Sequence, residues 1–301
     1  MESIKNNIVP NISYTYSQLK KLFLTFKSAQ GLAPRTIKEY KNTFRIFEQY
    51  YSSDNIDIIE MVISLQQMFS KWVHSAPATF NLPYEYLNCF FNWTINFNYM
   101  TENPLKLTGL KKKKNSNKIK NIPSDIIQQL LNLLDLKTYT GLRDYCFILL
   151  TLDTGIRPCE AVGLDITNAN LSNCSLKIPA NISKTRTERI LPLSFQTCEA
   201  LRKLIEIRLD GWPNFIFLTI NGNQFSTRAW EDRLEVYSDI LNYKICPYDF
   251  RHTFALLYLK NGGDIFTLKF ILRSYFHQYN SNISKFFRGR YCRTARTKIP
   301  S

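Results

Sequence analysis

The sequence predicts a mainly α protein with two domains: an amino-terminal helical domain and a second α-rich domain that contains one small antiparallel β-sheet. Three observations support this prediction. Apolar residues recur at helical spacing along most of the chain, beginning with Leu19, Leu22 and Phe23. A lysine-rich stretch at residues 111–121 divides the chain. Short runs with strand character, separated by asparagine-containing turns, lie between residues 164 and 193.

The composition indicates a globular chain with a polyanionic partner. The 301 residues are 45% hydrophobic, which is ample for packed cores. The 39 Lys and Arg residues against 24 Asp and Glu give a formal charge of +15. Such a surplus favours nucleic acid as the partner, ahead of an acidic membrane surface. No signal-peptide core or spanning run is present in the sequence. We therefore expect a cytoplasmic protein with no membrane partner.

The residue types that hold metals and cofactors are dispersed. The seven cysteines include no C-x-x-C pair, and the three histidines, His74, His252 and His277, lie far apart in the sequence. There is no glycine-rich phosphate loop. The sequence therefore predicts no disulfide, no metal and no cofactor.

The first domain is predicted to span residues 14–110, after a polar lead at residues 1–13. Its helical patterns cover residues 14–26, 36–50, 57–73 and 82–98. Aromatic residues such as Phe90 and Trp93 recur along these helices. We interpret them as a four-helix core rather than as a cofactor site.

The second domain is predicted to span residues 122–284, after a solvated lysine-rich linker at 111–121. Ser124 is a candidate helix cap. Helical patterns cover residues 125–136, 142–152, 194–208, 226–241, the stretch after Arg251, and 265–272. The strand-like segments are 164–178, 189–193 and 215–218. A basic tail without any acidic residue follows at 285–301.

Three stretches far apart in the sequence combine into a candidate phosphate clamp. Arg157 lies between two helical patterns with Glu160 a turn away to orient it, and Arg251 begins an apolar helix. Lys184 lies near the tip of a turn between two strands. Arginine presents a rigid bidentate fork that stays charged, whereas lysine supplies a mobile ammonium that can release a proton.

These three stretches, in this order, resemble the tyrosine recombinase (phage integrase) family over roughly residues 14 to 272. The family pattern is T-G-x-R-x-x-E-x-x-x-L, a lysine in a β-hairpin, H-x-x-R-H-T-F, then L-G-H and a tyrosine nine residues later. Arg157 matches the first arginine, Lys184 the lysine and Arg251 the second arginine.

The resemblance implies a DNA strand-exchange site in which a tyrosine attacks a phosphodiester and forms a 3′-phosphotyrosine. Arg157 and Arg251 would stabilise charge on the phosphate, and Lys184 would be the general acid. Tyr248 stands at the first family histidine; it can donate a hydrogen bond but is no acid–base group near neutrality, since its reference pKa is about 10. We interpret His252 as structural. The implied partner is double-stranded DNA, bound by a tetramer in the family, with no metal or ATP.

The carboxyl-terminal motifs depart from the family. Ser274 stands at the second histidine, and Ile283 occupies the slot of the nucleophilic tyrosine. The remaining candidates Tyr275, Tyr279 and Tyr291 all lack the family spacing. We therefore expect that the chain as written binds DNA but is impaired in strand exchange. The alternative is a non-catalytic DNA-binding regulator that has kept the clamp. A third interpretation is a protein too damaged at its carboxyl end to fold stably.

A shifted reading frame offers one explanation for the tail. Reading each codon one base later from Arg273 can give Gly and then His in the Ser274 slot. The codons of Ile283 and Ser284 give Tyr in this frame if they are ATA-TCN. The hypothesis is that an active recombinase gene lost or gained bases near codon 273, which would leave residues 285–301 out of frame.

Overall fold

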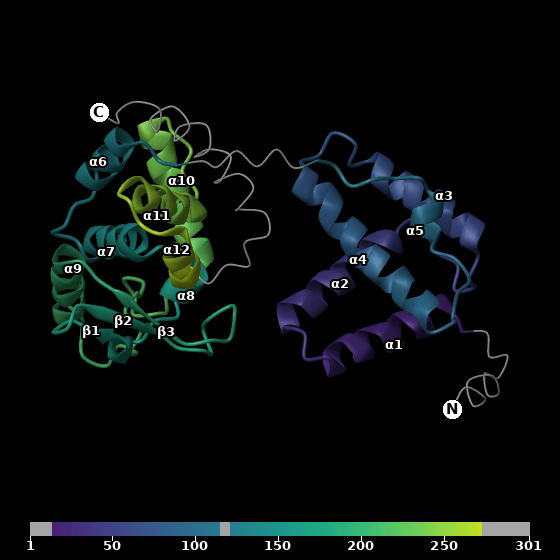
Figure 1. Ribbon diagram of the computed structural model, residues 1–301, viewed down its shortest axis with the longest axis horizontal. Helices are drawn as coiled ribbons and strands as arrows, with labels where there is room; N and C mark the ends of the chain where they lie inside the picture. Colours follow the sequence, from purple (N-terminus) through teal and green to yellow (C-terminus); the bar gives the residue numbers. More distant parts are fainter. Residues whose placement is uncertain (1–13, 115–120, 273–301) are drawn as a thin grey trace, which may run out of the picture. The chain divides into compact units, whose positions relative to one another are not determined.

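The computed structural model describes residues 14–114 and 121–272 (Figure 1). The chain divides into two compact units, Met1–Asn117 and Lys118–Ser301, which we call unit 1 and unit 2. Both units are mainly helical, and the sheet lies in unit 2. The predicted fold class is therefore confirmed.

Unit 1 consists of helices packed around an aromatic core. Its elements are α1 (Tyr16–Ala29), α2 (Pro34–Phe47), α3 (Ile58–Ser70), α4 (Pro77–Asn96) and the short α5 (Pro104–Leu107). Phe23 makes edge-to-face contacts with Phe44, Phe90 and Trp93, so residues from three helices meet at one buried ring. The interpretation of the aromatic residues as a helical core is confirmed.

Helix α4 begins earlier than the apolar pattern predicts. The sequence suggested a start at residue 82, but the helix starts at Pro77 and includes Pro83. Proline at a first helical position has its φ angle already fixed for a helix and lacks an N–H that would have no partner there. The apolar pattern therefore missed the first turns of the helix, although Phe80 there is buried in the core.

The lysine-rich stretch begins as part of unit 1. The Lys113 ammonium donates to the carbonyl oxygens of Trp72, Val73 and Ser75 at 2.7, 2.8 and 2.8 Å, and it lies 4.9 Å from the centre of the Phe80 ring. This lysine is half-buried, in contrast to the expectation of a fully solvated run. Lys113 therefore stabilises the turn after α3 through these hydrogen bonds.

Unit 2 combines helices with a three-stranded sheet. Its helices are α6 (Ser124–Asn132), α7 (Tyr139–Thr154), α8 (Pro158–Ala161), η1 (Ile166–Asn168), α9 (Phe195–Glu206), α10 (Thr227–Leu241), α11 (Pro247–Lys260) and α12 (Ile265–Leu272). The strands are β1 (Ala169–Asn170), β2 (Ser175–Ile178) and β3 (Arg189–Pro192), in the order β1-β2-β3 and antiparallel throughout. Figure 1 shows α7 between α9 and α11, and most of its residues are buried.

The segment 215–218, predicted as a strand, makes only isolated bridges, Asp165 with Phe215 and Leu218 with Gln224. Its backbone is nevertheless bonded on both sides. Ile216 N donates to Leu164 O at 2.8 Å, and Phe217 O accepts from the Phe225 amide at 3.1 Å. Residues 216–218 are buried as expected, but the run pairs through isolated bridges rather than through a continuous ladder.

Candidate active site

The end of α7 places Arg157 at the start of α8. Gly155 ends α7 in the left-handed region at φ 62°, and its N–H donates to the carbonyl of Thr151. A Cβ at this position would lie 2.3 Å from Cδ1 of Phe254, so the close approach of α11 also requires glycine. The chain therefore turns sharply, and Arg157 becomes the residue that precedes the first turn of α8.

Glu160 binds Arg157 in the way that the motif predicted. Its Oε1 accepts from Arg157 Nη1 at 2.9 Å, and its Oε2 accepts from the Arg157 backbone N–H at 3.3 Å. The same carboxylate accepts two hydrogen bonds from Arg189 on β3. Burial would raise the pKa of Glu160, but the hydrogen bonds and charge of Arg189, followed by the charge of Arg157, lower it. Glu160 is therefore an anion at neutral pH.

Arg251 reaches the same region from α11. Its Nη1 donates to the carbonyl of Gly155, two residues before Arg157, and its Nη2 donates to the carbonyl of Leu272 at 2.6 Å. Arg251 lies one turn into α11, which packs directly against α7. The structure therefore brings together the two arginines that the sequence singled out.

The resulting cluster is buried and has excess positive charge. Arg157, Arg189 and Arg251 are 7, 3 and 7% exposed, and Glu160 is fully buried. Three guanidiniums against one carboxylate leave a net charge of +2. Burial, and then the charge of Arg157, lower the pKa of Arg251 to about 9, so it remains protonated at neutral pH. An anion bound here would relieve the repulsion between these guanidiniums.

The other predicted residues, Tyr248, Lys184 and His252, differ in how exposed they are. Tyr248, one turn before Arg251 on α11, is 48% exposed. Burial of its hydroxyl raises its pKa, while Arg157 and Arg251 act in the opposite direction. Lys184 is exposed in the loop between β2 and β3, and no hydrogen bond or ion pair within the described residues ties it to either arginine. His252 is half-buried beside Arg251.

Several sequence predictions concern residues outside the described ranges. These are the substitutions Ser274 and Ile283, the alternative nucleophiles Tyr275, Tyr279 and Tyr291, and the basic tail at 285–301. The reading-frame hypothesis rests on the same segment. The last described residue is Leu272, whose carbonyl oxygen accepts a hydrogen bond from Arg251.

Sequence reasoning missed the buried charges of Arg143, Asp144 and Arg189. Arg189 was noted only as the start of a strand, because its partner Glu160 lies 29 residues away in the sequence. Asp144 on α7 is fully buried and accepts from Arg143 at 2.6 Å, Arg233 at 2.9 Å and Tyr237 at 2.7 Å. This second network joins α7 to α10.

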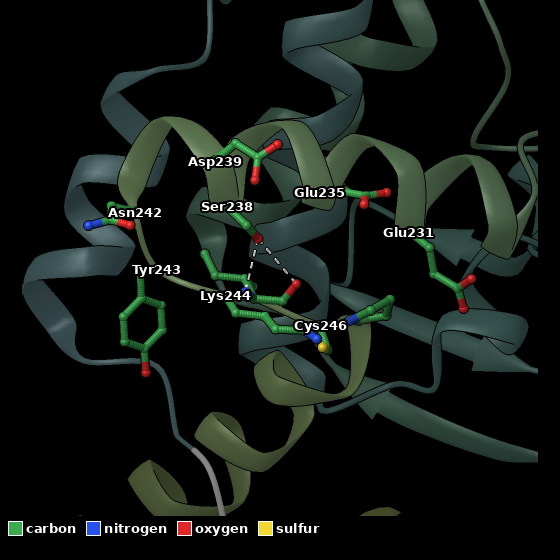
Figure 2. A pocket seen from close by; sticks show the side chains of 10 residues that line it. Glu231, Glu235, Ser238, Asp239, Asn242, Tyr243, Lys244 and Cys246 are labelled. Atoms are coloured by element: carbon green, nitrogen blue, oxygen red, sulfur yellow. Dashed lines mark hydrogen bonds between the residues drawn. The ribbon is translucent and has the colours of Figure 1, made fainter. Parts of the chain in front are cut away.

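A separate cleft of about 560 Å³ lies beside α10. Figure 2 shows Glu231, Glu235 and Asp239 along this helix, with Ser238 hydrogen-bonded to the backbone of Ile245. Its lining includes none of the clustered arginines, so it is distinct from the candidate active site.

The described residues contain neither a cluster suited to a metal ion nor a helix suited to cross a membrane. No group of three or more His, Cys, Asp and Glu side chains there is placed to hold a metal ion. None of the helices in residues 14–114 and 121–272 has both the length and the apolar character that crossing a membrane requires.

Comparison with known proteins identifies the family. The phage integrase family profile matches residues 120–273, just over half of the chain. The chain therefore belongs to the phage integrase family, which confirms the resemblance inferred from the three motifs. Tyrosine recombinase XerC of Myxococcus xanthus is 26% identical over 274 residues, covering 84% of this chain and 88% of the relative.

Solved structures share the fold. The Tn1549 transposon integrase in complex with circular intermediate DNA superposes with a TM-score of 0.70 at 18% identity, covering 86% of this chain and 91% of that chain. A lambda integrase tetramer bound to a Holliday junction gives 0.69 at 16% identity, covering 86% and 77%. At these identities the likeness establishes the fold alone.

Proposed function

We propose that this chain is a tyrosine-recombinase-like DNA-binding protein that holds a DNA phosphodiester between Arg157 and Arg251. The observation that carries the proposal is the buried arginine cluster with its net charge of +2. A phosphodiester brings one negative charge and two non-bridging oxygens, which match the donors of guanidinium forks. Its binding would reduce the excess charge and provide acceptors for the arginines.

Double-stranded DNA is the proposed partner. The Tn1549 and lambda integrases that share the fold were solved with DNA. The charge of +15 favours any polyanion, and exposed basic residues line α1 and α2 of unit 1. These residues are Lys21, Arg35, Lys38, Lys41 and Arg45. Each phosphate that they neutralise adds about −0.9 to the slope of log affinity against log salt.

The chemistry follows from the family resemblance. A deprotonated tyrosine oxygen attacks the phosphorus and forms the phosphotyrosine bond, the bond from phosphorus to the 5′ oxygen breaks, and a general acid protonates that oxygen so that it leaves as the 5′-hydroxyl. In this chain Lys184 would supply that proton, the two arginines would stabilise the developing charge, and Tyr248 would donate to a phosphate oxygen. Because Ile283 occupies the nucleophile slot, we propose that the chain binds DNA without completing strand exchange.

The same substitution favours a second candidate function, a DNA-binding regulator without catalysis. Nicked suicide duplexes distinguish the two functions once a binding site has been selected from a randomised pool. The proposal predicts a complex that detergent dissociates. A detergent-resistant adduct on Tyr275, Tyr279 or Tyr291 would establish an active enzyme. Absence of any duplex enrichment would contradict DNA binding itself.

The reading-frame hypothesis has its own test. Nucleotide sequence across codons 268–301, translated in all forward frames, is expected to show Gly-His and then Tyr in the frame one base later. Stop codons in that frame, or the lack of the tyrosine codon, would reject the hypothesis. In that case the regulator would become the function to test first.

A further inference from the structure

Arg189 is absent from the family motifs that marked the clamp, yet it makes the shortest bond to Glu160. Its Nη2 donates to Glu160 Oε2 at 2.5 Å and its Nη1 donates to Oε1 at 3.3 Å. Glu160 Oε1 also accepts from Arg157 Nη1 at 2.9 Å. One fully buried carboxylate thus joins an arginine on the sheet to the arginine that begins α8.

We propose that Arg189 is a positioning residue for the phosphate clamp. Through Glu160 it fixes the direction of the Arg157 guanidinium, and from β3 it fixes the base of the loop that carries Lys184. This inference rests on the proposed function, because it assigns Arg189 a role in presenting Arg157 and Lys184 to a phosphate.

The strand register places Arg189 at the base of that loop. Arg189 is the first residue of β3 and pairs with Ile178, the last residue of β2. The intervening residues, 179–188, form the loop with Lys184 near its middle. The carbonyl of Pro179 accepts from the Ser183 amide at 3.2 Å, so the first part of the loop is also held by its own backbone. The ion pair between Arg189 and Glu160 therefore holds the base of the loop, where β2 and β3 pair, against α8.

The chemistry of the pair requires arginine. The fork of Arg189 engages both oxygens of Glu160 at once, which fixes the plane of the carboxylate. A lysine at this position would carry the same charge on one flexible ammonium group. It would therefore leave the carboxylate of Glu160 free to rotate. Arg189 also has the largest lowering effect on the pKa of Glu160, so it keeps the carboxylate ionised and able to orient Arg157.

A role in stability alone explains this arrangement poorly. The Arg189 side chain is 1% exposed, and its Nε has no hydrogen-bond partner among the described residues. Burying a guanidinium with one unsatisfied N–H is unfavourable, and a buried ion pair is often no more stabilising than apolar residues of similar volume. Its benefit is instead geometric, because it specifies where Arg157 points.

The test is a titration of the full chain with inorganic phosphate, followed by NMR of the arginine Nε–Hε groups. The variants Arg157→Lys and Arg251→Lys assign the two signals of the clamp. Arg189→Met and Arg189→Lys remove the fork, and only the second keeps the charge. Arg228→Met is the matched control, because it removes one positive charge from an arginine that is 75% exposed on α10.

For both Arg189 variants we expect the phosphate affinity to fall roughly tenfold, which corresponds to the loss of one well-aligned charged hydrogen bond. We also expect the NMR signal of Arg157 to be displaced. Arg228→Met should bind phosphate like the parent chain. Affinity retained in Arg189→Lys would show that charge alone matters and would overturn the positioning role. A lowered melting temperature with unchanged affinity and an unchanged Arg157 signal would also overturn it.

The parent chain separates this inference from the proposed function. If its Arg157 and Arg251 signals do not respond to phosphate, the clamp itself is wrong. If they respond and the Arg189 variants respond equally, only the positioning role is wrong. A cooperative melt checks that each variant is folded. Should Arg189→Met fail to fold, Arg189→Lys decides the outcome, since it leaves Glu160 with a cationic neighbour.

Discussion

The guanidinium of Arg251 donates a 2.6 Å hydrogen bond from Nη2 to the backbone carbonyl of Leu272, the last residue of α12. Its Nη1 donates to the carbonyl of Gly155, which ends α7. Arg251 thus joins the ends of two helices to α11. Arg251, which we propose to bind the phosphate, therefore also holds these helices together. Small changes in the backbone that it contacts should lower the stability of the protein.

Gly155→Ala tests that sensitivity. A new Cβ would lie 2.3 Å from Phe254 and 2.8 Å from Leu272, at a residue with φ 62°. The left-handed conformation alone costs about 1–2 kcal/mol for alanine, and the steric clash adds to this. Gly262→Ala is the control, because φ is 84° there but nothing lies within 4 Å of the added atom. Urea unfolding should show a larger loss for Gly155→Ala; equal losses would contradict the close packing at this turn.

Glu160→Gln tests the charge at the centre of the cluster. The pKa of Glu160 is lowered from 4.5 in the folded state, so its stabilising contribution is present above pH 4.5 and is lost as the pH falls through the lowered value. At pH 7 the variant should lose about 3 kcal/mol, as expected when one partner of a buried ion pair is removed.

The difference between the parent chain and Glu160→Gln should shrink as the pH falls below 4.5 in urea-unfolding experiments. Glu206→Gln, an exposed position on α9, controls for general acid effects. A stability difference that does not depend on pH would show that Glu160 is not ionised in the folded protein.

Asp144→Ala tests the second buried network. The carboxylate of Asp144 accepts hydrogen bonds from Arg143, Arg233 and Tyr237 and is fully buried. Removing it strands an arginine in the interior and should cost roughly 3–5 kcal/mol. Asp232→Ala, whose side chain is 53% exposed on α10, should change stability by less than about 0.5 kcal/mol. Similar values for the two variants, measured by urea unfolding, would refute a structural role for the network.

Lys113→Ala tests the fastening of the turn after α3. Its ammonium bonds three carbonyl oxygens, whereas the neighbouring Lys112 pairs with Glu85 at the surface. Loss of charge-assisted bonds at a half-buried lysine should destabilise unit 1 by about 2 kcal/mol. Lys112→Ala should cost less than about 0.5 kcal/mol. Hydrogen exchange of the amides of α3 would reveal the difference, and equal protection in both variants would be evidence against it.

The sequence predicted most helices well because helices such as α1 and α9 bury one apolar face, which leaves a periodic pattern. It predicted less well where the cause of a structure lies outside the element itself. Pro77 begins α4 without belonging to the apolar pattern, and the segment 215–218 makes isolated bridges where a strand was predicted. Both features depend on local backbone chemistry or on tertiary contacts.

The candidate site likewise contains residues that the sequence predicted and residues that it missed. Arg157 and Arg251 lie in recognisable motifs, and they meet because α11 packs against α7. Arg189 was missed because its role depends on Glu160, 29 residues away, and no local pattern signals such a pairing. Asp144 was missed for a similar reason, since its partner Arg233 lies 89 residues away.

The central claim is that Arg157 and Arg251 together hold a DNA phosphate. The most direct measurement follows their Nε–Hε signals while a duplex selected from a randomised pool is added to the chain. We expect both signals to move with the midpoint of the binding curve, while the signal of the exposed Arg228 on α10 stays in place. A duplex that saturates the protein while both clamp signals remain unmoved would contradict the claim.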